Sequence, residues 1–144
     1  MSVAYDPENV FAKILRGEIP AHKVYEDDIA LALMDIMPRA EGHVLVIPKR
    51  PARGIVDIDP DNLAQLIKRV QHVAKAAKQA FGADGLTLQQ FNESAGGQVI
   101  FHLHFHILPR FDGVALRPPG AMGDHEKLRA QAEKIKAALG DFVA

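Results

Sequence analysis

The chain contains no cysteine among its 144 residues. That absence excludes a disulfide framework, a thiol nucleophile, an iron–sulfur cluster and every zinc site that relies on thiolate ligands. Nucleophilic or metal chemistry must therefore come from other side chains, and the redox state of the compartment stays open.

An excess of one charge is also absent, because 17 Lys and Arg residues stand against 18 Asp and Glu residues. This balance supplies no broad positive field for a nucleic-acid backbone, so any phosphate recognition must be local. The longest aliphatic run, 29–34, is too short to span a bilayer, and residues 1–9 lack the pattern of a signal peptide. The sequence predicts a soluble, cytoplasmic protein that binds neither nucleic acid nor membrane.

Apolar residues are plentiful: hydrophobic side chains make up 48% of the chain and charged ones 24%. These proportions suit one globular domain, and a chain of this length leaves no room for a second core. Asp6-Pro7 predicts the start of a short helix that ends at Gly17, and Asp59-Pro60 predicts a long helix over 62–81. A third helix is expected over 124–139.

Five short apolar runs, separated by turn-forming residues, are expected to be strands. The first three follow one another closely and predict a meander, whereas the last two flank a loop of small residues that suits close approach to a ligand. The five runs are 24–25, 29–34, 44–47, 86–91 and 99–108.

Three of the seven histidines alternate in the run Phe101-His102-Leu103-His104-Phe105-His106-Ile107-Leu108. In a strand, this alternation places the three imidazoles on one face, about 7 Å apart, and their apolar neighbours on the other. Solvent-facing positions ordinarily carry Lys, Glu and Thr, so we interpret the cluster as functional. Two chemistries stay open from these residues: a transition-metal site, or a catalytic cluster in which one imidazole attacks an electrophile and another donates a proton.

This run, with Gly97-Gln98 before it, resembles the signature of the histidine-triad (HIT) family, and the similarity extends from Val10 to Arg110. The resemblance implies an α+β fold with a five-stranded antiparallel sheet and two main helices. It places the HIT domain at 1–111 and treats 112–144 as a C-terminal tail with a helix, part of the same domain. It also implies a homodimer whose two sheets run together, which the large apolar face of helix 62–81 favours as well.

The resemblance makes His104 the nucleophile that attacks the α-phosphorus of a nucleotide and becomes a transient nucleotidyl-imidazole. A neutral imidazole suits this role, because its lone pair is free at pH 7 and it leaves readily in the second step. By the same resemblance, His106 contacts the phosphate and the leaving group. His102 and His43 complete a network that fixes ring orientation and tautomer.

The residues expected to hold the nucleoside are also carried over from the family. Asp35, eight residues before His43, is expected to bind the ribose hydroxyls, since a carboxylate accepts two hydroxyl donors well. The base pocket is expected from apolar residues that equally suit a hydrophobic core: Val10, Phe11, Ile14, Ile19, Ile36 and Leu45.

The loop before the triad is expected to face the phosphate and the leaving group. Asn92, Gln98 and the backbone amides near Gly97 match family positions that contact the α-phosphate. Val99 stands where many relatives have Ser or Thr, so one hydroxyl donor is missing and the leaving-group preference stays open.

No cofactor and no metal are expected. Many bacterial relatives hold a structural zinc through a Cys-x-x-Cys pair and two histidines, but Asn9, Ala12 and Pro51 stand at three of those four positions. His102 alone cannot assemble the tetrahedral site that zinc needs. The remaining histidines have no partner at useful spacing and are expected at the surface: His22, His72 and His125.

These features together predict a hydrolase of nucleoside 5′-phosphoramidates, or of related purine nucleotides with a small leaving group, that works through a His104-linked intermediate. Two alternatives stay open. One is a dinucleoside polyphosphate hydrolase, and the other is a nucleotide- or metal-binding module whose histidines bind without turnover.

Overall fold

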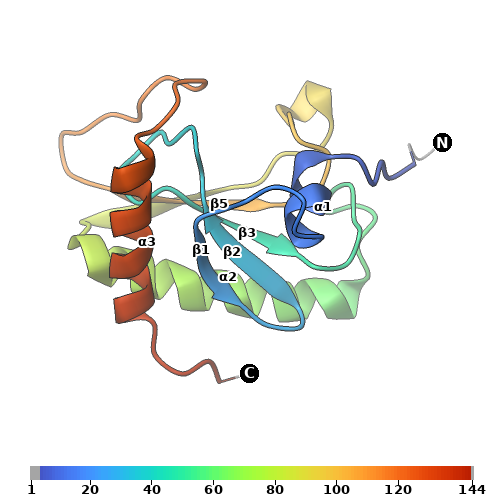
Figure 1. The fold of residues 1–144 in the computed structure, drawn as a ribbon, viewed down its shortest axis with the longest axis horizontal. Helices are drawn as coiled ribbons and strands as arrows, with labels where there is room; N and C mark the ends of the chain where they lie inside the picture. The colour runs from blue at the N-terminus through green and yellow to red at the C-terminus, as the bar shows by residue number, and fades with distance from the viewer. Residues whose placement is uncertain (1–3, 144) are drawn as a thin grey trace.

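The computed structural model describes residues 4–143, so the part of the signal-peptide expectation that falls on residues 1–3 lies outside it, as does residue 144. Figure 1 shows the order of the elements along the chain. They are α1 (Val10–Leu15), β1 (Lys23–Glu26), β2 (Ala30–Met34), β3 (Val44–Pro48), α2 (Pro60–Phe81), β4 (Gly85–Gln89), the short 3-10 helix η1 (Ser94–Gly96), β5 (Phe105–Arg110) and α3 (His125–Ala138).

The five strands form one antiparallel sheet in the order β1-β2-β3-β5-β4. This confirms the expected α+β class, the five-stranded sheet and the meander of the first three strands. The last strand in the chain, β5, lies between β3 and β4, with His106 opposite Leu45 on one side and Gln89 on the other. The strand that follows His102 and His104 and contains His106 is therefore held between two other strands rather than at an edge of the sheet.

Helices cover both faces of the sheet, with α2 and α3 on one side and α1 on the other (Figure 1). Strands β2 and β3 are buried along their whole length because both of their faces are covered. One core lies between the sheet and α2 with α3, and includes Val44 and Val46. A second core lies under α1 and is formed by Phe11, Ile14, Leu31, Leu33, Leu45 and Ile47.

The long helix α2 begins and ends as its sequence predicts. The Asp59 side chain accepts a hydrogen bond from the backbone amide of Asn62 at 3.0 Å, and Gly82 ends the helix in the left-handed region at φ 59°. The start predicted for the first helix is wrong, however. Asp6 instead accepts the amide of Glu8 in a turn, and Asn9 caps α1 by accepting the amide of Ala12 at 2.9 Å.

The last strand is shorter at its start than predicted. It begins at Phe105 rather than at residue 99 and runs to Arg110, because the residues before it bond outside the sheet. The backbone amide of Leu103 donates to the carbonyl of Ala52 at 2.8 Å. Only His106 of the three alternating histidines therefore lies within the strand.

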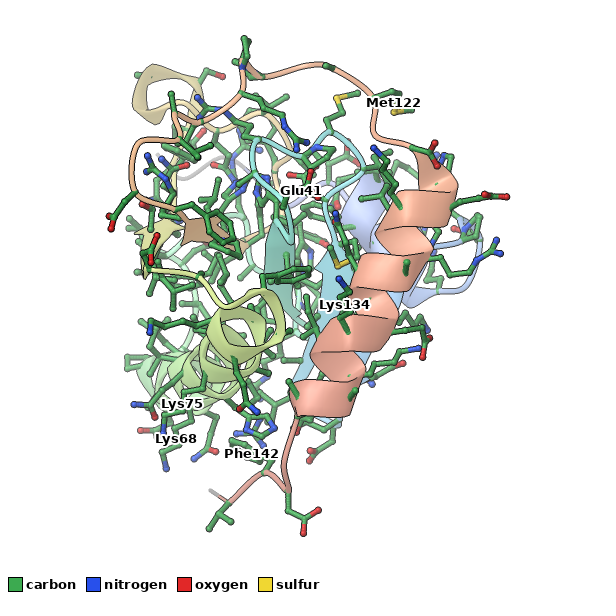
Figure 2. The ribbon with its side chains drawn as sticks, turned by 90° about the vertical axis from the view of Figure 1, so that its left-hand side faces the viewer. Glu41, Lys68, Lys75, Met122, Lys134 and Phe142 are labelled. Atoms are coloured by element: carbon green, nitrogen blue, oxygen red, sulfur yellow. The ribbon has the colours of Figure 1, made fainter. Side chains whose placement is uncertain are left out.

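The C-terminal helix α3 packs against α2 and along β1 (Figure 2). Its buried residues Leu128, Ala132 and Ile135 join the core between α2 and the sheet. Part of the apolar face of α2 that suggested a partner chain is thus covered within the chain itself. Beyond α3, the ring of Phe142 lies 4.3 Å from the guanidinium carbon of the buried Arg69.

The three histidines outside the triad region do not all behave as expected. His22, before β1, and His125, at the start of α3, form a hydrogen bond of 3.0 Å between Nε2 and Nδ1, so the prediction that neither has a partner is wrong. His72 packs edge-on against the rings of Tyr25 and Phe142. In residues 4–143, none of the helices combines the length and the apolar character that crossing a membrane requires.

Candidate active site

The ring of His102 is fully buried and both of its nitrogens are occupied. Its Nε2 lies 2.8 Å from the backbone carbonyl of Pro48, and its Nδ1 lies 2.5 Å from the hydroxyl of Tyr5. A carbonyl oxygen only accepts, so Nε2 carries the proton and Nδ1 accepts the hydrogen bond of the Tyr5 hydroxyl. His102 is therefore a neutral imidazole with neither nitrogen free for chemistry.

His104 is bound on one side only. Its Nδ1 donates to the backbone carbonyl of His102 at 2.7 Å, which fixes the proton on Nδ1 and leaves the lone pair on Nε2. Among the described residues, no group is hydrogen-bonded to that Nε2. The Phe11 ring packs edge-on against the imidazole, with centroids 4.9 Å apart, and restricts its rotation. This is the arrangement that a nucleophilic imidazole requires.

His43 and His106 form a second imidazole contact, with Nε2 of His43 and Nδ1 of His106 2.9 Å apart. The backbone amide of Arg39 donates to Nδ1 of His43 at 3.1 Å, so His43 holds its proton on Nε2 and donates it to His106. His106 then holds its own proton on Nε2. One backbone amide therefore fixes the tautomers of two consecutive rings.

His104 and His106 lie side by side, with ring centroids 4.9 Å apart. This corrects the spacing of about 7 Å expected for alternate positions on a strand. His104 precedes β5, whereas the expected spacing assumed that both residues stand on one regular strand.

Burial holds all four histidines in the neutral form. It lowers the pKa of His43 to about 3, where the neighbouring charges of His106 and Arg39 act in the same direction. It lowers the pKa of His102 and of His106 to about 4. The pKa of His104 is also lowered by burial, against a smaller opposing effect of its bond to the His102 carbonyl. All four imidazoles are therefore neutral at pH 7, and His104 keeps the lone pair on its Nε2.

Asp35 lies beside the second histidine contact, directly after β2. Its Oδ2 is 3.4 Å from Nε2 of His43 and 4.0 Å from Nδ1 of His106, while Oδ1 accepts the backbone amide of Met37 at 2.8 Å. Burial raises the pKa of this carboxyl, and the Met37 amide partly offsets the effect. The carboxylate oxygens retain lone pairs for further donors, such as a pair of hydroxyls.

Asp35, His43 and His106 also form a group of possible metal ligands, because one ligand atom from each lies within 4.8 Å of the others. Two of the three residues, His43 and His106, are already hydrogen-bonded to each other, and a cation bound between them would have to break that bond. Two imidazoles and a carboxylate suit a transition metal, but their present bonds favour a proton network. The absence of a structural zinc stays a prediction.

The loop between β4 and β5 is held mainly by its own amides. Gln98 is buried, accepts the amide of Glu93 at 2.7 Å and donates to the Arg53 carbonyl at 2.7 Å. Asn92 accepts the amide of Ile55 at 2.8 Å and bonds Gln90 through both ends of its side chain. Gln98 and Asn92, both predicted to contact the phosphate, therefore use their side-chain hydrogen bonds to hold the loop in shape.

Two further loop residues are open to a ligand. Gly97 has a φ of 95°, which a side chain would strain, and the Phe91 ring lies 3.3 Å from where its Cβ would stand. Val99 is 84% exposed, so an apolar side chain projects from the loop where many relatives carry a hydroxyl.

Most residues predicted for the base pocket belong to the core beneath α1. Phe11, Ile14 and Leu45 are buried there, and Val10 and Ile19 pack against them. Ile36, next to Asp35, is 41% exposed and offers an apolar surface outside this core.

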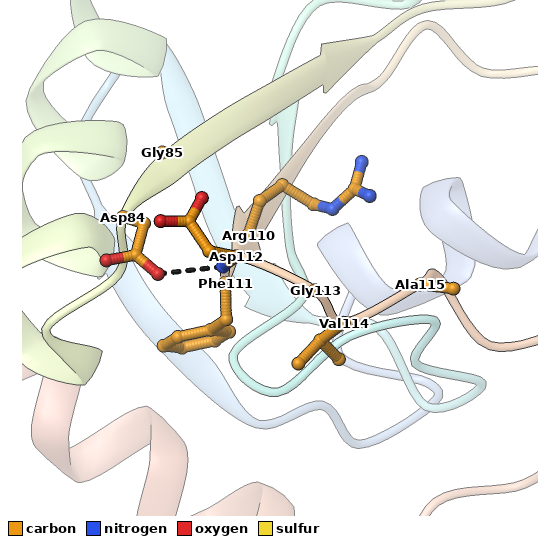
Figure 3. A pocket seen from close by; sticks show the side chains of 8 residues that line it. All are labelled: Asp84, Gly85, Arg110, Phe111, Asp112, Gly113, Val114 and Ala115. Atoms are coloured by element: carbon orange, nitrogen blue, oxygen red, sulfur yellow. Dashed lines mark hydrogen bonds between the residues drawn. The ribbon is translucent and has the colours of Figure 1, made fainter.

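The structure also contains a hollow away from the histidines, at the start of β4 and the end of β5 (Figure 3). There Asp84 accepts the amide of Asp112 at 2.8 Å, while the Arg110 side chain points away from both carboxylates and donates to Thr87. None of the four clustered histidines lines it. The chemistry of the site therefore rests on the histidine cluster.

Sequence reasoning missed Tyr5 and Arg39, and for Tyr5 the sequence holds no usable signal. Tyr5 bonds a residue 97 positions later in the chain, so no spacing relates the two. Arg39 acts through its backbone amide, which every residue except proline possesses.

Several known proteins are similar to this chain in both sequence and fold. A family model described as HIT domain matches residues 16–113. The chain is 38% identical over 131 residues to adenylylsulfatase HINT3 of Arabidopsis thaliana, across 90% of this chain and 66% of that protein. It is 34% identical over 137 residues to adenosine 5′-monophosphoramidase HNT1 of Candida albicans, across 90% of each. A crystal structure of a Hit-like protein involved in cell-cycle regulation from Bartonella henselae matches with a TM-score of 0.92 at 53% identity, across 95% of this chain and 100% of that one.

Proposed function

The chain belongs to the HIT family of nucleotide hydrolases and transferases, and we propose that it hydrolyses nucleoside 5′-phosphoramidates or related purine nucleotides through a covalent intermediate on His104. The observation that carries the proposal is the pair of fixed tautomers. His104 presents a lone pair on Nε2, and His106, its neighbour at 4.9 Å between ring centroids, presents a proton on Nε2.

The reaction takes place in two displacements at phosphorus. In the first, Nε2 of His104 attacks the α-phosphorus and the bond to the leaving nitrogen breaks, while the Nε2–H of His106 donates a hydrogen bond to that nitrogen. The nitrogen leaves as an amine with a proton taken from a water molecule. In the second, the resulting hydroxide attacks the same phosphorus and the bond to His104 breaks. The products are a nucleoside 5′-monophosphate and an amine.

The surroundings of this pair suit a nucleoside. Asp35 lies beside His43 and His106 with carboxylate oxygens that can accept ribose hydroxyls. Ile36, exposed next to it, offers an apolar surface for a base. The backbone amides of Gly97 and Gln98 already donate to carbonyls within their own loop, so backbone contacts to a phosphate are left to Val99 and Ile100.

The names of two relatives support the class of substrate. HNT1 is named an adenosine 5′-monophosphoramidase and HINT3 an adenylylsulfatase, and both names describe adenylyl compounds with a small leaving group. The exposed Val99 offers the leaving group an apolar contact instead of a hydroxyl donor, which favours an amine over an anion.

The test is turnover on a fluorogenic adenosine phosphoramidate, with adenylyl sulfate and a diadenosine polyphosphate assayed beside it. We expect the phosphoramidate to be cleaved fastest and His104→Ala to abolish its cleavage. Faster cleavage of the polyphosphate would support the alternative hydrolase. Tight binding of adenosine monophosphate without turnover of any of the three compounds would contradict the proposal and support a binding module.

We also propose a homodimer, formed at the edge of the sheet that β4 presents. Strand β4 pairs only with β5 among the described residues, and Leu88 on it is 51% exposed. Ile67 of α2 is 44% exposed and adds a further apolar side chain outside the core. Light scattering at micromolar concentration should give about twice the chain mass of 15.7 kDa, and a monomer would contradict the dimer.

The chain is expected to work without a structural zinc, because residues other than Cys and His stand at three of the four family ligand positions. Metal analysis of protein purified without a polyhistidine tag, before and after dialysis against a chelator, tests this. Stoichiometric zinc whose removal abolishes activity would contradict both the prediction and the metal-free mechanism.

A further inference from the structure

Tyr5, five residues before α1, contacts the triad from outside the sheet. Its hydroxyl lies 2.5 Å from Nδ1 of His102, and the two rings meet edge-on with centroids 5.6 Å apart. Tyr5 is only half-buried, yet its hydroxyl is directed to a fully buried imidazole rather than to solvent. None of the steps proposed above uses this hydroxyl.

The contact anchors His102, the residue whose backbone carbonyl holds the proposed nucleophile. Tyr5 donates to Nδ1 of His102, and Nε2 of His102 donates to the carbonyl of Pro48. The ring of His102 is thus held at both ends. The backbone carbonyl of this same residue accepts the Nδ1 proton of His104 at 2.7 Å.

We propose that Tyr5 is a positioning residue for the nucleophile: it anchors the His102 ring so that the His102 carbonyl holds His104 in the tautomer with its lone pair on Nε2. The inference rests on the proposed function for its effect on rate. Its effect on the tautomer does not depend on any substrate.

The physical reason is the burial of His102. Without the tyrosine hydroxyl, Nδ1 of a fully buried ring would have no donor, and an unsatisfied buried acceptor is costly. The ring can escape this cost by moving its proton to Nδ1 or by turning away from Pro48. Either change moves the peptide that orients His104, and it also disturbs Phe11, whose ring packs edge-on against both imidazoles, with centroids 6.3 and 4.9 Å away.

Tyr5→Phe removes only the hydroxyl, and Tyr25→Phe is its matched control. The hydroxyl of Tyr25 likewise bonds a polar group inside the protein, the half-buried Asp27 carboxylate at 2.7 Å, but on the side of the sheet that α2 covers. We expect Tyr5→Phe to lower kcat on the phosphoramidate roughly 10- to 100-fold, the range between a lost hydrogen bond and a wrong tautomer. The Kd for adenosine monophosphate should stay within twofold, and Tyr25→Phe should leave both quantities within twofold of wild type.

A double-mutant cycle tests whether Tyr5 acts through His102. In a His102→Ala background, Tyr5→Phe should cause no further loss of kcat, because the ring that it anchors is gone. Equal losses from Tyr5→Phe in both backgrounds would overturn the inference. So would a wild-type kcat in the Tyr5→Phe single variant.

Imidazole ¹⁵N NMR supplies a readout that needs no turnover, and it separates this inference from the proposed function. In the wild type, His102 should show its proton on Nε2 and His104 on Nδ1. In Tyr5→Phe, the His102 resonances should shift or broaden and His104 should lose its pure Nδ1-H form. Unchanged His104 resonances in Tyr5→Phe, or a wild-type His102 protonated on Nδ1, would overturn the inference even if the enzyme cleaves its substrate as proposed. If Tyr5→Phe does not fold, two other measurements test the inference: the tautomers of His102 and His104 in the wild type, and the kcat of Tyr5→Leu.

Discussion

Two histidine pairs in this protein have almost the same geometry and very different surroundings. His43 and His106 are 2.9 Å apart between ring nitrogens, and His22 and His125 are 3.0 Å apart. Their ring centroids are 5.2 and 5.3 Å apart. The first pair is packed in the sheet beside Asp35, whereas the second is exposed and joins the start of β1 to the start of α3.

The two pairs differ in the groups that bind the ring nitrogens not used in the contact between the two histidines. The backbone amide of Arg39 occupies Nδ1 of His43 and so sets the direction of every proton in the first pair. In the exposed pair, no such backbone group among the described residues fixes the tautomer, and protons can exchange with solvent. A contact between imidazoles therefore becomes a hydrogen bond of fixed direction only where burial and backbone groups determine the tautomer.

The largest effect on turnover is expected when the proposed nucleophile is removed. His104→Ala should lower phosphoramidate turnover by several orders of magnitude, because neither imidazole of the exposed pair can replace a covalent catalyst. Binding of adenosine monophosphate, measured by calorimetry, should survive. Turnover within a few-fold of wild type, in protein free of wild-type contamination, would show that the nucleophile is elsewhere.

Removal of the buried donor should have a smaller effect. His106→Ala deletes the proton on Nε2 and leaves the nucleophile with its own tautomer, which depends on the His102 carbonyl. We expect a loss of roughly 10- to 100-fold in kcat, the size of a lost hydrogen bond to the leaving nitrogen. The loss should shrink for substrates with better leaving groups, and equal losses for good and poor leaving groups would contradict its role as hydrogen-bond donor to the leaving group.

Acid should separate the two pairs by their effect on stability. The folded pKa of His106, in the buried pair, is about 4 against an ordinary value of 6.5, so the unfolded chain takes up a proton first as pH falls. Stability contributed by this group is present above pH 6.5 and is lost as pH falls toward 4, by roughly 3 kcal/mol in all. Its partner His43 and the neighbouring His102 act in the same direction.

Denaturant titrations between pH 8 and pH 4 measure that loss. A variant that carries His22→Asn and His125→Asn should keep most of the pH dependence, since the buried rings remain.

Turnover should persist below pH 6.5, because the pKa of His104 is lowered as well. An acid limb at or above pH 6.5 would contradict the neutral, buried nucleophile.

The smallest effect is expected from the exposed pair alone. His22→Asn and His125→Asn should each leave kcat and KM within twofold and the free energy of unfolding within about 1 kcal/mol, as is usual at exposed positions. A tenfold fall in kcat from either variant would show that α3 and the nucleotide site are coupled. The comparison between the two pairs would then fail.

A feature of this fold could be predicted from the sequence where the contacts that determine it join residues close together in the chain. Asp59 and Gly82 bound α2 through residues next to them, and the predicted ends of that helix are confirmed. The start of β5 was mispredicted because Leu103 bonds Ala52, a partner far away in the chain. The exposed pair was missed for the same reason, since its two members are 103 residues apart.

In the site, alternation correctly separates the histidines from the apolar residues Leu103, Phe105 and Ile107, which face the core under α2. It cannot supply the tautomers, because these depend on backbone groups of Pro48, His102 and Arg39 that carry no sequence signal.

The stereochemical course at phosphorus tests the central claim most directly. A phosphoramidate made chiral at the α-phosphorus by a sulfur substituent is hydrolysed in isotopically labelled water, and the configuration of the product is read by ³¹P NMR. Two in-line displacements, first by His104 and then by water, each invert the phosphorus, so the account predicts net retention. Net inversion would mean a single attack by water and would contradict a nucleotidyl intermediate on His104.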